Sequence, residues 1–198
     1  SNLTSNFIES LKRQLPEYLT LADKNKILEE LKRFPDSFNP YTSLISKDVE
    51  QGDAFAEVPV YFYANGEKKQ VAAMVLSNSC DISPQNKRPI PANVIVATMF
   101  SLAKYENRLT ASNLSPKAIS DIIQAIKAQK VTNLFYLPKH PNCKLSEDYV
   151  VRLDSLTSIP LNTFLSSKGT QLFRLGSLGF YIFLFKLSVH FCRFPADR

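Results

Sequence analysis

The stretch AFAEVPVYFYANGEKKQVAAMVL, residues 54–76, decides the fold class. Its first ten residues predict a strand, and Pro59 inside it predicts an edge position or a bulge, because proline donates no hydrogen bond to a neighbouring strand. Asn65-Gly66 is the strongest short-range signal for a hairpin turn. The continuous apolar run Val71–Leu76 predicts a second strand, buried on both faces. The stretch therefore predicts a β-hairpin within a sheet.

More strands follow this hairpin along the chain. Runs rich in apolar and β-branched residues predict strands at Asn93–Phe100, Val131–Leu137, Tyr149–Leu153 and Leu156–Leu161. The segment between the hairpin and the first of these, residues 77–92, contains three prolines and predicts a loop.

One helix is inserted among these strands, over residues 115–130. Ser115-Pro116 is typical of a helix start, with proline at the first helical position. The isoleucines that follow recur at i, i+3, i+4 and i+7, which predicts an amphipathic helix. They are Ile119, Ile122, Ile123 and Ile126.

Helices also flank the β-rich region on both sides. Start signals and apolar stripes predict two helices in the first 40 residues, ending at Pro16 and Pro35. A highly apolar helix is predicted from Gln171 or Ser177 to Phe194. Segregated helices and strands favour the α+β class, and short strands joined by a tight hairpin favour a small barrel.

We therefore expect an α+β protein: a small, mostly antiparallel β-barrel with an inserted helix, flanked by an N-terminal helical pair and an apolar C-terminal helix. The expected organisation is a helical arm at 1–50, the barrel at 51–165 with its helix at 115–130, and the C-terminal helix at 166–198. That last helix is expected to pack on the barrel or on a partner.

The charge of the chain is unevenly distributed. Of 24 Lys and Arg and 18 Asp and Glu, residues 1–50 contain seven and eight, so the whole excess of +6 lies in residues 51–198. A basic region of this kind favours a phosphate-bearing or acidic partner. The five glycines of the chain argue against a glycine-rich phosphate loop.

The cysteines and the hydropathy of the chain indicate the cellular compartment in which we expect the protein. Cys80, Cys143 and Cys192 are odd in number and far apart, which argues against a secreted disulfide framework. The longest apolar run, residues 178–185, is much shorter than the ~20 residues that a membrane span needs. We therefore expect reduced thiols, no signal peptide, no membrane span and a cytoplasmic location.

Several short segments carry a family resemblance. Gly52-Asp53 opens the first strand, Val75-Leu76-Ser77 ends the central one, and Val94–Ala97 and Tyr149–Leu156 follow. Over residues 51–165 this pattern resembles the plasmid-toxin PemK/MazF-like small-barrel family. The loop Ser77–Ile82 also resembles a Ser-x-x-Cys-Asp loop of uncharacterised barrel proteins on mobile elements, and an integron gene-cassette protein would fit it.

The resemblance to the toxin family implies metal-independent cleavage of single-stranded RNA. In that chemistry a basic side chain and a hydroxyl stand beside the scissile phosphate. Where the family has an Arg-Pro pair, this chain has Lys69-Gln70, and the family's Thr or Ser after the third strand falls near Ser101. Lys69 and Ser101 are therefore the candidate catalytic residues.

Polar residues after the central strand form a candidate binding cleft, because such groups often line one at a strand end. Formation of tight turns is the alternative role of the same side chains. Basic and aromatic residues elsewhere would add a nucleic-acid site if they converged, since cations bind phosphates and aromatic rings stack on bases. The candidate binding residues are Ser77, Asn78, Asp81, Lys87 and Arg88. The basic and aromatic residues are Lys68, Lys69, Lys104, Arg108, Tyr61, Tyr63 and Tyr105.

Two short His/Cys pairs contain zinc-ligand types. His140 and Cys143 share a loop, and His190 and Cys192 lie near the C-terminus. The second pair is two residues apart on a predicted helix, where neighbours on one face are three or four apart, so its side chains diverge. We expect no metal and no cofactor.

The predicted C-terminal helix has an apolar stripe at helical spacing. Core packing and a homo-oligomeric interface both account for it, since large aromatic residues anchor interfaces as well as cores. The candidate interface residues are Phe180, Phe183, Leu184, Leu187 and Phe191.

Three functions remain open at this stage. The favoured one is a non-catalytic binding protein of a bacterial mobile element that takes RNA, another polyanion or a partner protein, with a homo-oligomer formed through the C-terminal helix. The second is a diverged, toxin-like, metal-independent RNA endonuclease. The third is a small-molecule binding protein with its pocket under the 77–92 loop.

Overall fold

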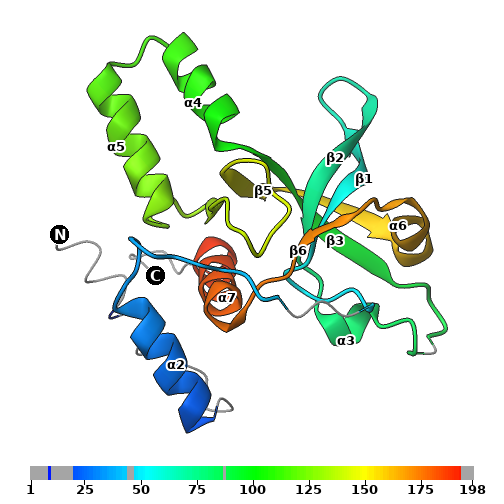
Figure 1. The fold of residues 1–198 in the computed structure, drawn as a ribbon. Helices are drawn as coiled ribbons and strands as arrows, with labels where there is room; N and C mark the ends of the chain where they lie inside the picture. Colours follow the sequence, from blue (N-terminus) through cyan, green and yellow to red (C-terminus); the bar gives the residue numbers. More distant parts are fainter. Residues whose placement is uncertain (1–8, 10–19, 44–46, 87, 193–198) are drawn as a thin grey trace, which may run out of the picture.

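The chain folds as an α+β structure around a six-stranded antiparallel sheet, in a computed structural model that describes residues 9, 20–43, 47–86 and 88–192 (Figure 1). The strands are β1 (Ala54–Phe62), β2 (Glu67–Val75), β3 (Asn93–Ser101), β4 (Leu134–Leu137), β5 (Tyr149–Pro160) and β6 (Gln171–Phe173). The helices are α2 (Leu21–Leu31), α3 (Ser79–Ile82), α4 (Leu102–Ala111), α5 (Pro116–Lys127), α6 (Leu161–Ser167) and α7 (Ser177–Phe191).

The sheet is open in the described part of the chain. Its strand order is β4-β5-β3-β2-β1-β6, with β4 and β6 at the two edges and no pairing between them. A closed barrel is therefore not confirmed. A backbone hydrogen bond of 2.8 Å, from Lys144 N to Leu172 O, crosses from the connection after β4 to β6.

The predicted hairpin is confirmed as β1–β2. Gly66 in its turn has a φ of 70°, a conformation that glycine adopts without strain. The register of β1 shifts between Phe55 and Val58, where Glu57 has a φ of 56°. Pro59 lies beyond the reach of β6, so it faces no second partner strand. Both the bulge and the edge position that the proline predicted are present.

The sheet buries apolar side chains on both faces. On β2, Met74 belongs to one core cluster, while Ala73 and Val75 belong to the other. This is the pattern predicted for a central strand covered on both sides. The larger cluster also takes its residues from α2, α5 and α7, and the smaller cluster is closed by Phe164 of α6.

The predicted inserted helix is confirmed as α5. The Ser115 hydroxyl accepts a hydrogen bond from Ala118 N, and Pro116 is the first helical residue. Its apolar face is buried through Ile119, Ile123 and Ile126. In the N-terminal region, α2 matches the second predicted helix, and the helix predicted before Pro16 lies outside the described residues.

Several sequence predictions are corrected. The 77–92 segment is not wholly loop, because Asn78 caps the short helix α3. Of the two predicted starts of the C-terminal helix, Ser177 is confirmed, and residues 171–173 form β6 instead. The two strands predicted at 149–153 and 156–161 are one strand, β5. Helices α4 and α6 were not predicted, because each buries a single residue, Leu102 and Phe164.

One buried lysine joins α7 to the end of α5. Lys186 Nζ donates to Gln129 O at 2.8 Å and to Val131 O at 2.7 Å. Burial lowers the pKa of Lys186 to about 7, because the charged form loses its hydration. The Gln129 amide in turn donates to Tyr136 O at 2.8 Å and accepts from Tyr136 N at 3.1 Å. Lys186 thus anchors the α5–β4 connection, and the Gln129 side chain pairs with the outer edge of β4.

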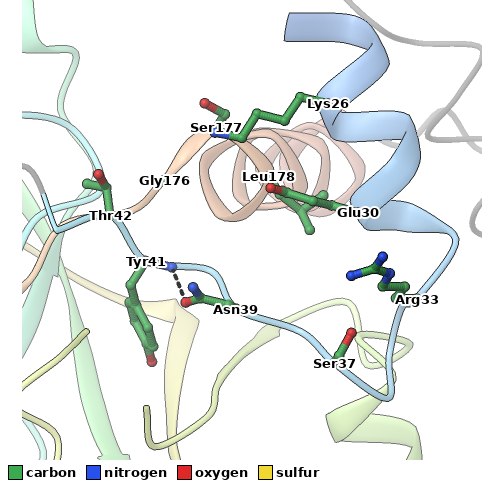
Figure 2. A pocket seen from close by; sticks show the side chains of 10 residues that line it. All are labelled: Lys26, Glu30, Arg33, Ser37, Asn39, Tyr41, Thr42, Gly176, Ser177 and Leu178. Atoms are coloured by element: carbon green, nitrogen blue, oxygen red, sulfur yellow. Dashed lines mark hydrogen bonds between the residues drawn. The ribbon is translucent and has the colours of Figure 1, made fainter. Parts of the chain in front are cut away.

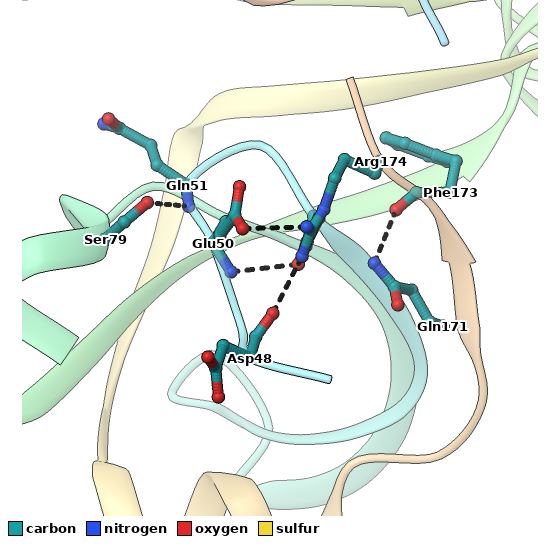
Figure 3. Close-up of polar contacts among 8 residues, drawn as sticks. Asp48, Glu50, Gln51, Ser79, Gln171, Phe173 and Arg174 are labelled. Atoms are coloured by element: carbon teal, nitrogen blue, oxygen red, sulfur yellow. Dashed lines mark hydrogen bonds and ion pairs between the residues drawn. The ribbon is translucent and has the colours of Figure 1, made fainter. Parts of the chain in front are cut away.

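A buried ion pair joins the start of β1 to the end of β6. Arg174 donates through Nε and Nη2 to the two carboxylate oxygens of Asp53, both at 2.7 Å. The Asp53 side chain is fully buried and the Arg174 side chain is 9% exposed. Arg174 also donates to Glu50 Oε1 at 2.8 Å and to Asp48 O at 2.7 Å, as Figure 3 shows. The hydrogen bonds to Asp53 raise the pKa of Arg174 further above its usual value.

Asp53→Asn is expected to lower the free energy of unfolding by about 3–5 kcal/mol, because it removes the only fully buried of the two carboxylates that face the Arg174 guanidinium. The amide of the new residue would also face Arg174 with a second donor. Urea denaturation measures the loss. Glu29→Gln is the matched control, since its ion pair with Lys32 is exposed and is worth about 0.5 kcal/mol. Equal effects of the two variants would contradict the role given to the buried pair.

Lys186→Met is expected to change how stability depends on pH. Between pH 7 and the ordinary lysine pKa of about 10.4, the unfolded chain holds a proton that the folded chain has lost, so wild-type stability rises with pH. The variant lacks this rise, which reaches about 1.4 kcal/mol per pH unit. Urea denaturation at several pH values gives the difference. Lys130→Met, at an exposed position, should keep the wild-type slope.

Candidate functional site

An open groove of about 600 Å³ lies between the β1–β2 hairpin, α4 and β5. In Figure 1 the hairpin and the α4–α5 pair stand on either side of the end of the sheet that carries this groove. The lining residues come from the hairpin, from the ends of β3 and β4, from α4 and from β5. They are Phe62, Lys69, Val71, Thr98, Met99, Phe100, Lys104, Tyr105, Arg108, Asn133, Leu134, Arg152, Asp154 and Ser155.

Two cations reach the groove from α4. Lys104 and Arg108 are four residues apart, which places them on one face of the helix. Both are exposed, because α4 buries only Leu102. No ion-pair partner is found for either among the residues that the structure describes. Their charges are therefore open to an anionic ligand.

A third cation, Arg152, is held by a carboxylate on its own strand. Its Nε and Nη2 donate to Asp154 Oδ1 and Oδ2 at 3.0 and 2.8 Å. Residues two apart on a strand point to the same face, so the pair lies together in the groove. The hydrogen bonds from Arg152 hold the pKa of Asp154 below its usual range, and those to Asp154 raise the pKa of Arg152. The pair is half-exposed, so a ligand could compete for the guanidinium.

Aromatic rings flank these charges. The rings of Phe100 and Tyr105 are 5.7 Å apart with an interplanar angle of 48°. On the hairpin side, Lys69 Nζ lies 5.9 Å from the ring centre of Phe62 and forms an ion pair with Glu67. The groove thus offers flat apolar surfaces next to cationic groups.

Two hydroxyl groups, one from β3 and one from β5, form a hydrogen bond in the groove. Thr98 Oγ1 donates to Ser155 Oγ at 3.0 Å. The pairing of β3 with β5 shifts register between Ala97 and Met99. This irregularity gives β5 extra residues opposite Thr98, and Asp154 and Ser155 are among them.

The structure brings only one of the two candidate catalytic residues into the groove. Lys69 lines it. Ser101 is 3% exposed, and its hydroxyl caps α4 by accepting a hydrogen bond from Lys104 N at 3.3 Å. Its role in this structure is therefore to begin a helix, and it presents no hydroxyl to the groove surface.

The candidate binding residues after β2 are occupied by local contacts. Ser77 Oγ accepts from Ile95 N at 2.7 Å, and Asn78 Oδ1 accepts from Cys80 N at 2.9 Å. Arg88 lies 3.5 Å from a carboxylate oxygen of Asp81 and donates to Cys80 O at 3.2 Å. These contacts match the turn-forming role of such side chains. Lys87 lies outside the described residues.

The basic residues do not all converge. Arg88 lines a separate cavity of about 190 Å³, together with residues at the start of β3 and on α6. Lys104 and Arg108 follow the other end of β3, and a strand of that length spans about 25 Å. Lys69, Lys104 and Arg108 therefore share a groove from which Arg88 is excluded.

The candidate interface residues of α7 are largely used by the chain itself. Phe183 is fully buried and contacts Phe135 with ring centres 5.7 Å apart. The others that face the core, Phe180, Leu184 and Leu187, are partly buried against it. Phe191 is 55% exposed at the end of the helix. Homo-oligomerisation through α7 stays a prediction, with Phe191 as its most accessible side chain.

A second cavity, of about 360 Å³, lies between α2 and the start of α7 (Figure 2). Lys26 and Glu30 reach it from α2, and Arg33 reaches it from the turn after α2. Its opposite wall is made by Tyr41 and Ser177 with their neighbours. The carboxylate of Glu30 offsets part of the positive charge, and no aromatic face other than that of Tyr41 lines the cavity. The groove beside the hairpin is thus the more strongly cationic of the two.

Potential metal ligands are dispersed. Over the described ranges, no three His, Cys, Asp or Glu side chains are grouped so that they could hold a metal ion. The cysteines Cys80, Cys143 and Cys192 are free thiols. Cys143 Sγ donates to His140 O at 3.2 Å, which is a loop contact.

No family model matches this chain, and no curated protein matches it. The resemblance to PemK/MazF-like barrels therefore stays a prediction. Within the described segments, no helix combines the length and the apolar character required to cross a membrane.

Some of the residues that line the groove are predictable from the sequence, and others are not. The sequence predicts that basic and aromatic residues form a site if they converge, and the groove brings together four of them: Lys69, Lys104, Tyr105 and Arg108. Arg152 was not among the predicted residues, although it interrupts an apolar strand and is followed two residues later by Asp154. An arginine and an aspartate at alternate strand positions would have signalled a charged pair on one face.

Arg152→Gln is expected to raise the pKa of Asp154, because the hydrogen bonds that stabilise the carboxylate are lost. Carbon-13 NMR titration of the side-chain carboxyl measures this shift. Glu67 serves as the internal control, since hydrogen bonding to Lys69 lowers its pKa independently of Arg152. An unchanged Asp154 titration would show that the pair does not form in solution.

Proposed function

We propose that the groove between the β1–β2 hairpin and α4 binds single-stranded nucleic acid without cleaving it. The observation that carries the proposal is the convergence of four cationic side chains and several aromatic rings on one open groove. Asp154 is the single carboxylate among the lining residues. Cationic grooves track a phosphate backbone, and aromatic faces stack on bases of any sequence.

A single strand fits this groove better than a duplex does. Bases that are paired in a helix do not expose their faces, whereas the unstacked bases of a single strand can stack on aromatic side chains. Tyr105 and Phe62 stand on opposite walls of the groove, on α4 and on the hairpin. The cations Lys104 and Arg108 lie on the same wall as Tyr105, where the backbone of such a strand would run.

The lining residues favour binding over cleavage. General acid–base catalysis of phosphodiester cleavage needs a group that can take up and release a proton near neutral pH. No imidazole lines the groove, and the carboxylate of Asp154 is engaged by Arg152. The hydroxyl of Ser101 is buried in its helix cap.

A metal-independent RNA endonuclease is the second candidate. The observation in its favour is the position of Lys69, which lines the groove where the resemblance requires a cation. With either of these two functions we also propose the PemK/MazF-like relationship, barrel closure, the mobile-element setting and a homo-oligomer.

A small-molecule site under the 77–92 loop is less favoured. The cavity beside that loop measures about 190 Å³, whereas ligand pockets are commonly about 300–1,000 Å³.

Lys104→Gln and Arg108→Gln are each expected to weaken binding of a fluorescent single-stranded oligonucleotide. Each should also lower the magnitude of the log K against log salt slope by about 0.7, the value for one lost phosphate contact on a single strand. Fluorescence anisotropy over a salt series measures both effects. Lys32→Gln removes the same charge from the turn after α2 and should leave the slope unchanged. Equal effects of all three variants would remove the groove from consideration.

Asp154→Asn is expected to strengthen the same binding, because it frees the Arg152 guanidinium and removes a negative charge from the groove. Anisotropy at fixed salt measures the gain. Arg152→Gln should have the opposite effect. A loss of affinity in both variants would mean that the pair acts only as a structural support.

Incubation with single-stranded RNA in the presence of a chelator separates the two candidate functions. The binding proposal expects intact RNA on a denaturing gel at protein concentrations that saturate the groove. Cleavage that is abolished by Lys69→Ala would instead establish the endonuclease.

A further inference from the structure

The outer half of the β1–β2 hairpin is a two-stranded ribbon that extends beyond the sheet. β6 pairs with β1 only at Ala54 and Phe55, and β3 pairs with β2 only from Ala73 to Val75. The pairs from Val58–Val71 to Phe62–Glu67 therefore have no third strand. Figure 1 shows this ribbon standing away from the rest of the sheet. Two-stranded ribbons gain little stability alone. Val58 and Val60 of this ribbon are buried in the smaller core cluster, whereas its outer end, from Tyr61 round the turn to Gln70, is largely exposed and accessible to a ligand.

The two faces of the ribbon have similar chemistry. Lys69 and Phe62 belong to the lining of the groove. Tyr61 precedes Phe62, and its directly paired residue, Lys68, precedes Lys69. Because side chains alternate between the faces of a strand, Tyr61 and Lys68 share the opposite face. Each face thus presents one aromatic ring and one lysine, and the groove face also carries Glu67, which pairs with Lys69.

The tip of the ribbon is strongly aromatic and exposed. Tyr63 is 91% exposed and Tyr61 is 47% exposed. Their rings are in edge-to-face contact, with centres 4.9 Å apart and an interplanar angle of 83°. Asn65 and Glu67 hydrogen-bond across the turn, which holds the tip in shape. A large exposed aromatic pair beside cations is typical of an interaction surface.

We propose that the tyrosine tip, Tyr61 and Tyr63 with Lys68, is a second stacking site for the nucleic acid that occupies the groove. The strand leaves the groove past Lys69, passes over the turn and stacks at least one base on Tyr63. The proposal rests on the proposed function. Continuity with the cationic groove, and an exposed aromatic pair beside Lys68 at the tip, select this ligand over others.

The distances suit a continuous strand. From Lys69 to the turn at Gly66 the ribbon runs for about 10 Å at the usual rise per residue of a strand. Small single-strand binding modules commonly cover about 4–16 nucleotides. An oligonucleotide that ends inside the groove does not contact Tyr63, whereas one that continues for about 10 Å along the ribbon does. The tip is expected to contribute only to binding of the longer one.

The test compares labelled oligouridylates of about four and about twelve nucleotides by fluorescence anisotropy on the full chain. Tyr63→Ala is expected to weaken binding of the long oligonucleotide by about tenfold, the lower range for loss of one stacked base, and to leave binding of the short one unchanged. Tyr63→Phe keeps the aromatic face and should bind both as the wild type does. Because Tyr63 is exposed, neither substitution should affect folding.

The outcomes separate the two proposals. If both oligonucleotides bind and Tyr63→Ala leaves the long one unaffected, the tip proposal is wrong and the groove proposal stands. If neither binds, both are wrong. A sedimentation assay with anionic phospholipid vesicles covers the other class of partner. If Tyr63→Ala abolished vesicle binding while leaving oligonucleotide binding intact, the tip would be a membrane contact and the proposal would be overturned.

Discussion

The buried pairing of Arg174 with Asp53 is the constraint on which the arrangement of the sheet depends. The two residues are separated by 121 positions, and their contact holds the segment before β1 against the segment after β6. Burying two charges is costly, so the pair is tolerated only because the guanidinium finds a carboxylate, a second carboxylate and a carbonyl together. It fixes which strand lies beside β1, because Arg174 follows β6 directly.

With the base of β1 fixed in this way, the groove follows from strand length. β6 is short and leaves the outer part of β1 without a neighbour, so the hairpin projects. At the same end of the sheet, β3 passes directly into α4 through the Ser101 cap, which raises a cationic helix opposite the hairpin. The register shift between β3 and β5 places Arg152 and Asp154 between them. The positions of the cationic walls thus depend on where the strands end in space. Local sequence patterns do not give this information.

Local sequence signals predicted the structure correctly where a residue acts on the backbone of its neighbours in the chain. Asn65-Gly66 fixed a turn, Pro59 an unpaired edge, and Ser115-Pro116 a helix start. They failed where tertiary contacts outweigh local preference. The apolar stripe of α4 is short, because Leu102 is buried and Tyr105 and Leu109 are only half-buried. Lys186 interrupts an apolar run in the sequence, yet it is buried and donates to two carbonyl oxygens. The sequence indicated which residue types could form the site. It did not indicate that Lys104 and Arg108 follow the end of β3 beside the groove whereas Arg88 lies near its opposite end.

The side chain of Gln129 gives the open sheet a property that its strand order alone would not suggest. By pairing its amide with both backbone groups of Tyr136, it occupies the position that an added strand would need along β4. The Lys144 amide similarly engages Leu172 on β6. Neither outer strand therefore offers an uninterrupted ladder to another chain, so the two edges of the sheet, which stays open over the described residues, are protected against edge-to-edge aggregation.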